Sequence, residues 1–164
     1  MQKECECIMF GKLKNLFSQP GITIASPVSG MVVPLTEVPD PTFAQGILGP
    51  GAAVQPSEGR IVAPANGTVD MMFDTGHAVS MTTSEGAELL IHVGIDTVNL
   101  KGQHYTAKCK SGDTVRKGDT LIEFDIDAIR EAGYEVVTPV IVCNPDAFAS
   151  VKTVDAGSVQ AGDD

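Results

Sequence analysis

Glycine and proline recur along the whole of this 164-residue chain, and they limit it to short elements of secondary structure. The sequence holds 17 glycines and 10 prolines, and little of what lies between them has the spacing of an amphipathic helix. Short runs of branched apolar residues bounded by such turn-forming residues are typical of strands. We therefore predict an all-β fold, an antiparallel β-sandwich or barrel of short strands with one or two short helices.

Two segments share the pattern Pro-x-x-Gly-x-Val, at residues 27–32 and again at residues 64–69. Proline fixes φ at one corner of a turn, and glycine permits a positive φ at the other. This weak internal repetition predicts two similar β motifs packed as one sandwich.

Two further segments carry their own secondary-structure signals. Residues 125–133 predict a short helix with an aspartate cap and a glycine stop. Residues 136–142 predict a buried strand, in which Pro139 requires an edge or a bulge.

Length and charge restrict the function classes. A chain of this length fits one domain, which we place at residues 21–154, between a mobile N-terminal tail (1–20) and a flexible acidic tail (155–164). The formal net charge of −10 argues against nucleic acid as a partner, because phosphate binding requires basic patches. It favours a basic partner surface, or solubility alone. No apolar run reaches the ~20 residues that span a bilayer, and no secretory signal is apparent, so we expect a cytoplasmic protein.

The N-terminal tail contains a candidate amphipathic helix. Apolar side chains recur at helical spacing, with lysines beside them, in the segment Phe10-Gly11-Lys12-Leu13-Lys14-Asn15-Leu16-Phe17. Two interpretations stay open: a disordered tail, or weak peripheral contact of residues 9–18 with an anionic membrane surface at the inner face of the cell membrane. We also expect Met9 to be the initiator, with residues 1–8 an upstream extension.

Two of the three histidines lie in apolar, strand-like surroundings. His92 follows the run Leu89–Ile91 and precedes Gly94, and His77 precedes a second apolar run. A histidine in an apolar strand is most often structural. A neutral imidazole near pH 7 is nevertheless available as a nucleophile, a base or a metal ligand. If the two strands are antiparallel neighbours, both rings share one face. The third, His104, lies in a polar stretch and is predicted at the surface.

The segment His92-Val93-Gly94-Ile95-Asp96-Thr97-Val98 resembles the active-site segment of the glucose-type IIA component of the bacterial phosphoenolpyruvate-dependent sugar phosphotransferase system. Further segments resemble that family in the same order, and together they cover roughly residues 22–150: 38–44, 62–69, 75–78 and 118–125. The resemblance implies an antiparallel sandwich that relays a phosphoryl group. The donor is the phosphohistidine of the small carrier HPr, and the acceptor is a cysteine on the IIB domain of a sugar permease.

The same resemblance assigns roles to four residues at the centre of the site. His92 is the phosphoryl acceptor, and the carbonyl of Gly94 fixes its tautomer. His77 stabilises the phosphoryl group, and Thr75 orients His77. No cofactor is required for this relay.

A surrounding partner-binding set is also expected. Two carboxylates suit an arginine on the carrier, and an apolar ring suits a transient interface. Ordinary core packing is the alternative for the ring, most of all for Val98. The set comprises Asp40, Asp96, Phe43, Ile47, Leu48, Phe73 and Val98. Residues 38–51, which carry three of the apolar members, are either tucked onto the core or present a binding face.

Three other functions compete with the relay. A zinc protein or hydrolase would use His77, His92 and an acid such as Glu88, although the usual histidine spacings are missing. A biotinyl or lipoyl carrier domain would need a lysine at a hairpin tip, and none is found there. A regulatory binding module is compatible with the relay, since a phosphoryl group on His92 changes the surface charge that partners meet. The four cysteines are expected to be free thiols. The sequence does not indicate which sugar or IIB domain is served, nor the oligomeric state.

Overall fold

The structure is a computed structural model that describes residues 6–9, 21–154 and 156–164, with only the backbone given for residues 6–9. The candidate helix at residues 10–17, and with it most of the predicted membrane contact at 9–18, lies outside the described residues. Within the described residues, no helix is both long enough and apolar enough to cross a bilayer.

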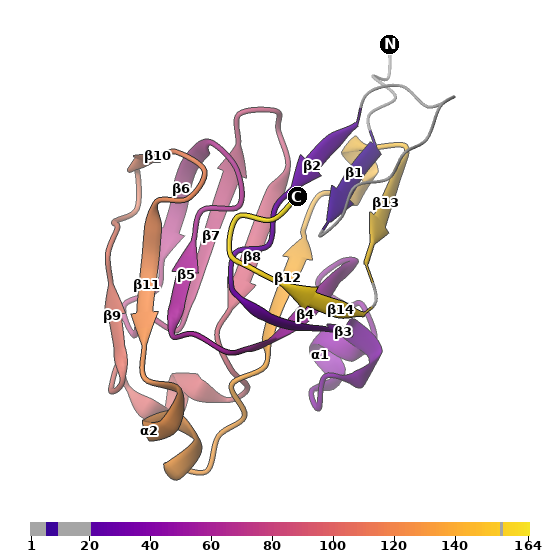
Figure 1. Ribbon diagram of the computed structural model, residues 1–164. Helices are drawn as coiled ribbons and strands as arrows, with labels where there is room; N and C mark the ends of the chain where they lie inside the picture. The colour runs from indigo at the N-terminus through magenta and orange to yellow at the C-terminus, as the bar shows by residue number, and fades with distance from the viewer. Residues whose placement is uncertain (1–5, 10–20, 155) are drawn as a thin grey trace.

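The described strands form three sheets (Figure 1), and the main one is antiparallel throughout. Its strands are, in spatial order, β10 (Thr114–Val115), β6 (Gly67–Met72), β7 (Ala78–Thr83), β8 (Glu88–His92), β12 (Thr138–Val142), β4 (Gly51–Pro56), β3 (Gly30–Pro34) and β14 (Gly157–Val159). A second antiparallel sheet joins β5 (Arg60–Val62), β11 (Thr120–Phe124) and β9 (Tyr105–Ala107). This is the all-β fold that the glycine and proline pattern predicts.

A third, small sheet is parallel, and its order is β13 (Ser150–Thr153), β1 (Glu6–Met9) and β2 (Ile22–Ile24). Part of the N-terminal segment that we predicted to be a mobile tail therefore lies in a strand between two others. Figure 1 shows β1 beside β2 and β13.

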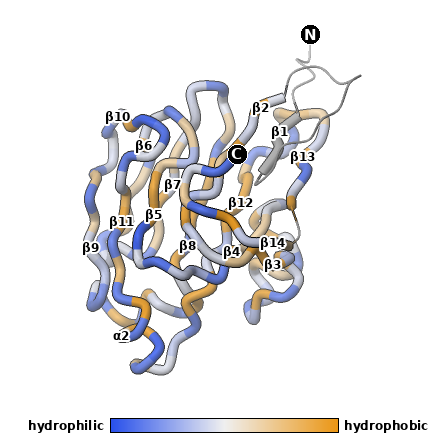
Figure 2. The backbone as a smooth tube through the Cα atoms, viewed as in Figure 1, coloured by the Kyte–Doolittle hydropathy of each residue, from blue (hydrophilic) through white to orange (hydrophobic). Residues whose placement is uncertain are grey.

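The main core lies between the two antiparallel sheets. Alternate residues of β6, β7 and β8 face those of β5 and β11, and the apolar side chains among them are fully buried, including Ile61, Val69, Met81, Leu89 and Ile122. Figure 2 shows hydrophobic positions along the inner strands. A second, smaller cluster lies on the other face of the eight-stranded sheet, where Phe43 packs with Ala53 and Ile141. That smaller cluster supports the candidate site.

The helices are short. In the described part of the chain, the α-helices are α1 (Pro41–Ala44) and α2 (Ile126–Glu131), and the 3-10 turns are η1 (Leu35–Glu37), η2 (Thr97–Leu100) and η3 (Pro145–Ala147). The predicted helix at 125–133 is confirmed as α2: the Asp125 side chain accepts a hydrogen bond from the backbone N–H of Ala128, and Gly133 follows with a φ of +92°.

Of the two positions predicted for Pro139, an edge or a bulge, the edge is wrong, because β12 lies between β8 and β4 near the middle of the sheet. The ladder with β8 begins only at Val140, so Pro139 lies beyond the end of that pairing and faces only Ala53 of β4. Proline has no backbone N–H to contribute to a ladder. A central strand tolerates it here because the pairing on one side has already ended.

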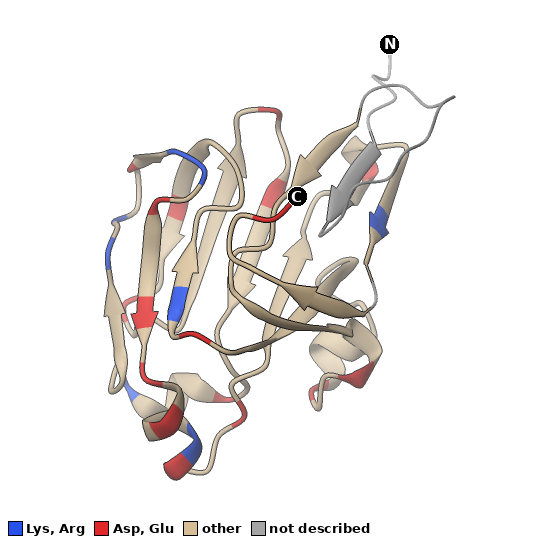
Figure 3. Ribbon diagram, viewed as in Figure 1, with Lys and Arg blue, Asp and Glu red and all other residues tan. Residues whose placement is uncertain are grey.

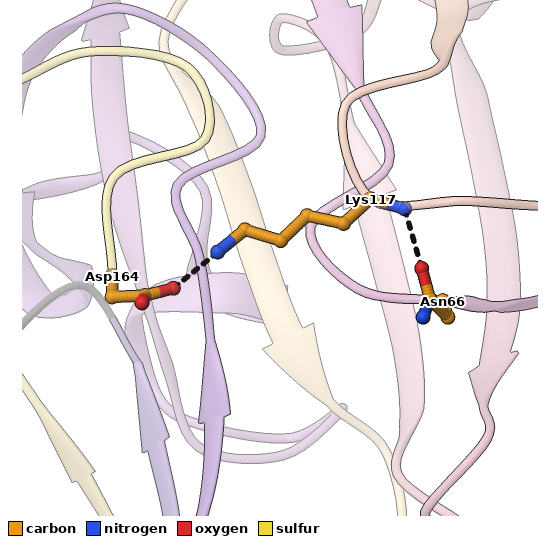
Figure 4. A network of polar contacts seen from close by, with 3 residues as sticks. All are labelled: Asn66, Lys117 and Asp164. Carbon is orange, nitrogen blue, oxygen red and sulfur yellow. Dashed lines mark hydrogen bonds and ion pairs between the residues drawn. The ribbon is translucent and has the colours of Figure 1, made fainter.

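The acidic C-terminal segment also differs from the flexible tail that we predicted. Strand β14 pairs with β3, and the turn that follows it exchanges backbone hydrogen bonds with Ser26. Figure 4 shows the last residue, Asp164, in an ion pair with Lys117, whose backbone N–H donates to the side chain of Asn66. Backbone pairing with an open sheet edge does not depend on side-chain hydrophobicity, so the small, acidic composition of this segment gave no signal of it.

The two Pro-x-x-Gly-x-Val corners occupy equivalent places in the main sheet, but the positive φ expected of their glycines is found at Gly30 (+157°) and not at Gly67. Each glycine opens a strand of the main sheet, β3 at Gly30 and β6 at Gly67. In each case the glycine lies against a backbone carbonyl of the next strand: a Cβ atom on Gly30 would lie 2.0 Å from the oxygen of Gln55, and one on Gly67 would lie 2.2 Å from that of Thr82. Only glycine permits so close an approach at either corner.

Candidate active site

The two strand-associated histidines meet on neighbouring antiparallel strands, as expected. His92 is the last residue of β8, and His77 immediately precedes β7, where Ala78 pairs with His92. The backbone N–H of Val93 donates to the carbonyl of His77 over 2.7 Å. The two ring centroids are 5.0 Å apart with the planes at 79°, so one ring presents its edge to the other.

The His92 ring is half-buried and is held by one specific hydrogen bond. Its Nδ1 lies 2.7 Å from the carbonyl oxygen of Gly94, which accepts a hydrogen bond from Nδ1–H. Burial lowers the pKa of His92, and the opposing effects of the Gly94 carbonyl, Asp40 and Asp96 only partly offset it. The ring is therefore neutral near pH 7, and Nε2 carries the free lone pair of a nucleophile.

Gly94 can hold this position only as glycine. Its φ of +90° lies in the left-handed region, and an added Cβ would lie 2.8 Å from the carbonyl oxygen of Glu135 and 2.5 Å from Cγ2 of Thr97. Its own N–H donates to the carbonyl of Val137 over 3.2 Å. The segment that leaves β8 thus passes close to the segment that enters β12, and this brings the Gly94 carbonyl back toward the ring of His92.

His77 is more deeply buried, with 4% of its surface exposed. Burial, and secondarily the neighbouring His92, lower the pKa of His77 to about 4. Its Nδ1 forms a hydrogen bond with the hydroxyl of Thr75, and the ring of Phe73 meets it edge-on at 5.5 Å. When the Thr75 hydroxyl donates to Nδ1, the proton of the neutral ring is on Nε2, which is then a hydrogen-bond donor for the space beside His92.

The expected apolar ring divides into buried, half-buried and exposed members, and Phe73 is the half-buried one. Phe43, the buried residue of α1, packs against His92 with ring centroids 5.1 Å apart. Three others are exposed: Ile47 at 67%, Leu48, and Val98 at 51%. The exposure of Val98 contradicts the alternative interpretation, in which this residue packs in the core. Residues 38–51 therefore combine the two expected arrangements. Phe43 anchors the segment to the core, and Ile47 and Leu48 are exposed to solvent.

The two expected carboxylates flank His92. Asp40 caps α1 by accepting a hydrogen bond from the backbone N–H of Thr42, and Asp96 has a left-handed φ of 59° at the start of η2. Both raise the pKa of His92, the direction expected from a negative charge near an imidazole. Figure 3 shows acidic positions distributed over the ribbon with fewer basic ones, in keeping with the net charge of −10.

The zinc interpretation gains no support from this geometry. Glu88 and His92 are the first and last residues of the same strand, so about 13 Å of extended chain separates them. Among the described residues, no three histidine, cysteine or acidic side chains gather in a group that could hold a metal ion. The surface position predicted for His104 is confirmed, because this residue is exposed.

Comparison with known proteins identifies the family. A model of the family described as "phosphoenolpyruvate-dependent sugar phosphotransferase system, EIIA 1" matches residues 22–148. The chain belongs to this family. It is therefore a phosphotransferase component, as the resemblance of its histidine segments implied.

The relatives are consistent with this. The chain is 44% identical over 155 residues to a "PTS system glucose-specific EIIA component" of Oceanobacillus iheyensis, covering 92% of this chain and 94% of that one. It is 47% identical over 137 residues to a "PTS system beta-glucoside-specific EIIBCA component" of Bacillus subtilis, covering 84% of this chain but only 22% of that larger protein. The solved glucose permease IIA from Mycoplasma capricolum superposes with a TM-score of 0.80 at 31% identity, over 85% of this chain and 90% of that chain.

Two residues of this IIA protein contact the active-site backbone without having been singled out from the sequence. The Thr97 hydroxyl and the Tyr105 hydroxyl each donate to the carbonyl oxygen of Val93 over 2.8 Å. Thr97 lies within the segment that carries the family resemblance, so its position was a signal that it belongs to the site. Tyr105 comes from β9 in the other sheet, and only the packing of the two sheets brings it here.

Proposed function

We propose that this IIA protein carries a phosphoryl group on Nε2 of His92. The group comes from the phosphohistidine of HPr and passes to a cysteine on a IIB domain, which couples it to sugar uptake and phosphorylation. The observation that carries this assignment is the hydrogen bond from Nδ1–H of His92 to the Gly94 carbonyl. It leaves the lone pair on Nε2, the nitrogen that is free to attack.

Each transfer exchanges one bond to phosphorus for another. In the first, the Nε2 lone pair of His92 attacks phosphorus, and the bond from phosphorus to the carrier's imidazole nitrogen breaks with its electron pair going to that imidazole. In the second, a cysteine thiolate attacks phosphorus, and the bond to Nε2 breaks and returns His92 to its neutral form. No redox partner or metal is needed in either step, and positioning with charge stabilisation supplies the catalysis.

His77 is assigned to stabilise the phosphoryl group during these transfers. With Nδ1 held by the Thr75 hydroxyl, Nε2–H of His77 is available to the phosphoryl oxygens from a ring whose centroid is 5.0 Å from that of His92. A preorganised donor in a partly water-excluded site contributes more than one in water. The low pKa of His77, about 4, keeps its ring neutral at physiological pH.

The exposed residues around the histidines are assigned to partner docking. Ile47, Leu48 and Val98 give an apolar surface beside Asp40 and Asp96. Such a mixture suits a transient complex with a partner that presents basic and apolar groups. The EIIBCA name of the Bacillus subtilis relative, which includes both B and A, supports a IIB domain as one such partner. Other regulatory targets fit the same surface, since a phosphoryl group on His92 alters its charge.

The test is to incubate the protein with HPr, enzyme I and labelled phosphoenolpyruvate, and to map the phosphoryl group by peptide mass spectrometry under basic conditions. We expect an acid-labile label on His92 that is absent from His92→Gln. Absence of label from folded wild-type protein would refute the relay. A label on another residue would refute the assignment of His92.

Membrane contact by residues 9–18 remains a prediction from the sequence. It rests on the helical spacing of apolar residues with flanking lysines, which suits an anionic lipid surface. Co-sedimentation with vesicles containing anionic lipid would test it, by comparison of the full chain with a chain that begins at residue 21. We expect binding by the full chain alone, and equal, negligible sedimentation of both would end the proposal.

A further inference from the structure

One buried carbonyl beside the active site accepts hydrogen bonds from two hydroxyl groups. The oxygen of Val93 lies 2.8 Å from Oγ1 of Thr97 and 2.8 Å from the hydroxyl of Tyr105. Val93 is completely buried. A carbonyl oxygen has two lone pairs, so these two donors satisfy it in full. Thr97 belongs to the loop that leaves β8, whereas Tyr105 reaches the carbonyl from strand β9 of the facing sheet.

The position of this carbonyl in the chain gives the contact its importance. It belongs to the peptide between Val93 and Gly94, and the next carbonyl along the chain accepts the Nδ1–H of His92. The N–H of the same peptide donates to the carbonyl of Val137. Both polar ends of one peptide plane are therefore fixed, and a peptide is rigid about its C–N bond. The Gly94 carbonyl belongs to the following peptide, whose N–H, from Ile95, donates to the carbonyl of Glu135 over 3.0 Å. The fixed Val93–Gly94 peptide holds the other side of Gly94, the most flexible residue type, and so restrains the direction of the Gly94 carbonyl further.

Tyr105 also touches the turn that carries the second histidine. A Cβ atom on Gly76, the residue before His77, would lie 3.2 Å from Cβ of Tyr105. The ring of Tyr105 in turn stacks on Phe124 of β11, with centroids 6.4 Å apart and planes at 25°. The side chain is thus held by the smaller sheet and contacts the backbone beside both histidines. Burial raises the pKa of Tyr105 to about 12, so its hydroxyl keeps the proton that it donates.

We propose that Tyr105 is a positioning residue of the relay: its hydroxyl holds the Val93–Gly94 peptide so that the Gly94 carbonyl selects the Nδ1–H tautomer of His92. This inference rests on the proposed function of His92. Without the hydroxyl, the Gly94 carbonyl has more freedom and His92 populates the Nε2–H tautomer, whose Nε2 has no lone pair for attack on phosphorus. Tyr105 acts through the backbone and does not touch the phosphoryl group.

The test variant is Tyr105→Phe, which keeps the Cβ beside Gly76 and the ring that stacks on Phe124 and removes only the hydroxyl. The matched control is Tyr134→Phe, because Tyr134 is the other tyrosine of the chain and packs, partly buried, against the main core. The tautomer of His92 is read in unphosphorylated protein from its ring ¹⁵N chemical shifts, with His92→Gln to assign the signals. The rate of phosphoryl uptake from phospho-HPr is measured in parallel, and thermal unfolding reports on the fold.

We expect Tyr105→Phe to lower the population of the Nδ1–H tautomer and to slow phosphoryl uptake about two- to tenfold, the effect of one lost hydrogen bond. Tyr134→Phe should match wild type in both measurements. An unchanged His92 tautomer in folded Tyr105→Phe would overturn the proposal, whatever the rate. If wild-type protein takes up no phosphoryl group while Tyr105→Phe still shifts the tautomer, the relay fails and the positioning role stands.

A second variant covers the case in which Tyr105→Phe does not fold. Thr97→Val removes the other hydroxyl donor to the same oxygen at nearly the same side-chain volume. We expect it also to lower the Nδ1–H population of His92. Where both single variants fold, their combination should reduce that population by more than the sum of the two effects, because the Val93 carbonyl is then left with no donor. Strictly additive effects would show that the two hydroxyls do not act on a shared carbonyl, and would overturn the proposal.

Discussion

Two hairpins of the eight-stranded sheet reach the same histidine with connections of very different length. The β3–β4 connection comprises residues 35–50 and includes η1 and α1, whereas the β6–β7 connection comprises only residues 73–77. Both hairpins begin at a Pro-x-x-Gly-x-Val corner. Both also place a ring against His92: Phe43 of the long connection at 5.1 Å, and His77 of the short one at 5.0 Å.

The two connections supply different properties to the site. The short one holds a buried, hydrogen-bonded imidazole, and a tight hairpin restrains the geometry that charge stabilisation requires. The long one is anchored by buried Phe43 and exposes Ile47 and Leu48 to solvent. An exposed loop of this kind suits binding to different partners in turn. We infer that chemistry and docking are divided between the two halves of an internal repeat, and this division can be tested.

The largest expected effect comes from the short connection. His77→Gln removes the donor beside His92, and we expect the protein still to accept a phosphoryl group but to pass it to IIB about 100- to 1,000-fold more slowly, the cost of one preorganised donor. Single-turnover transfer from phosphorylated protein to a IIB domain measures this rate. Ile47→Ala, measured at saturating IIB, is the control and should transfer normally. Normal transfer by His77→Gln would remove the catalytic role of the short connection.

The corners that open the two hairpins were predictable from sequence, and the strand order was not. Pro-x-x-Gly-x-Val is a local pattern of turn-forming residues, so it marked both corners, although the glycines are required by the close approach of a carbonyl rather than by a shared positive φ. The same holds for α2, whose cap and stop lie within a few residues of each other. The central position of β12, despite Pro139, depends on where the β8 ladder ends, which is a long-range property.

The site divides in the same way. His77, His92 and Gly94 lie in short segments that resemble a family, and their contacts are with residues two positions away in sequence or on the adjacent strand. Tyr105 contacts Val93 across the two sheets, and no local pattern marks that contact. Pairing of the C-terminal segment with β3 likewise depends on which sheet edge is left open. Sequence reasoning thus identified the chemistry and missed the residues that the packing of distant strands brings to it.

The second prediction tests whether the two hairpins are equivalent at their corners. Gly30→Ala and Gly67→Ala each place a Cβ 2.0–2.2 Å from a backbone oxygen, so the neighbouring strand must move. We expect each substitution to lower the free energy of unfolding by about 3 kcal/mol, the upper end of the usual cost of overpacking. Urea unfolding measures both. Gly86→Ala, at a turn with open space around it, separates steric contact from the strain of a positive φ. A large loss at one corner only would break the equivalence.

The third prediction concerns the loss of stability at acidic pH, to which the short connection contributes through the buried ring of His77. The pKa of His77 is about 4 in the folded protein and about 6.5 when unfolded. The unfolded state therefore binds more protons between these values, and stability falls as pH drops from about 6.5 to about 4. We expect this ring to account for about 2–3 kcal/mol of that loss. Unfolding of wild type and His77→Gln at pH 7.5 and pH 4.5 measures it, and equal acid sensitivity of the two would contradict the burial of a neutral His77.

The smallest expected effect belongs to the long connection. Ile47 is 67% exposed, so Ile47→Ala should leave stability and acid sensitivity unchanged, because few contacts of the fold depend on it. It should weaken binding to HPr or IIB about threefold to tenfold, the usual range for truncation of one apolar contact residue at an interface. Titration calorimetry or the partner concentration at half-maximal transfer measures this. Met31→Ala is the control, since Met31 is 52% exposed on β3, toward the end of that strand remote from the long connection. If wild type, Ile47→Ala and Met31→Ala bind equally well, the long connection has no docking role and serves only to hold Phe43 against His92. Both hairpins would then serve the chemistry.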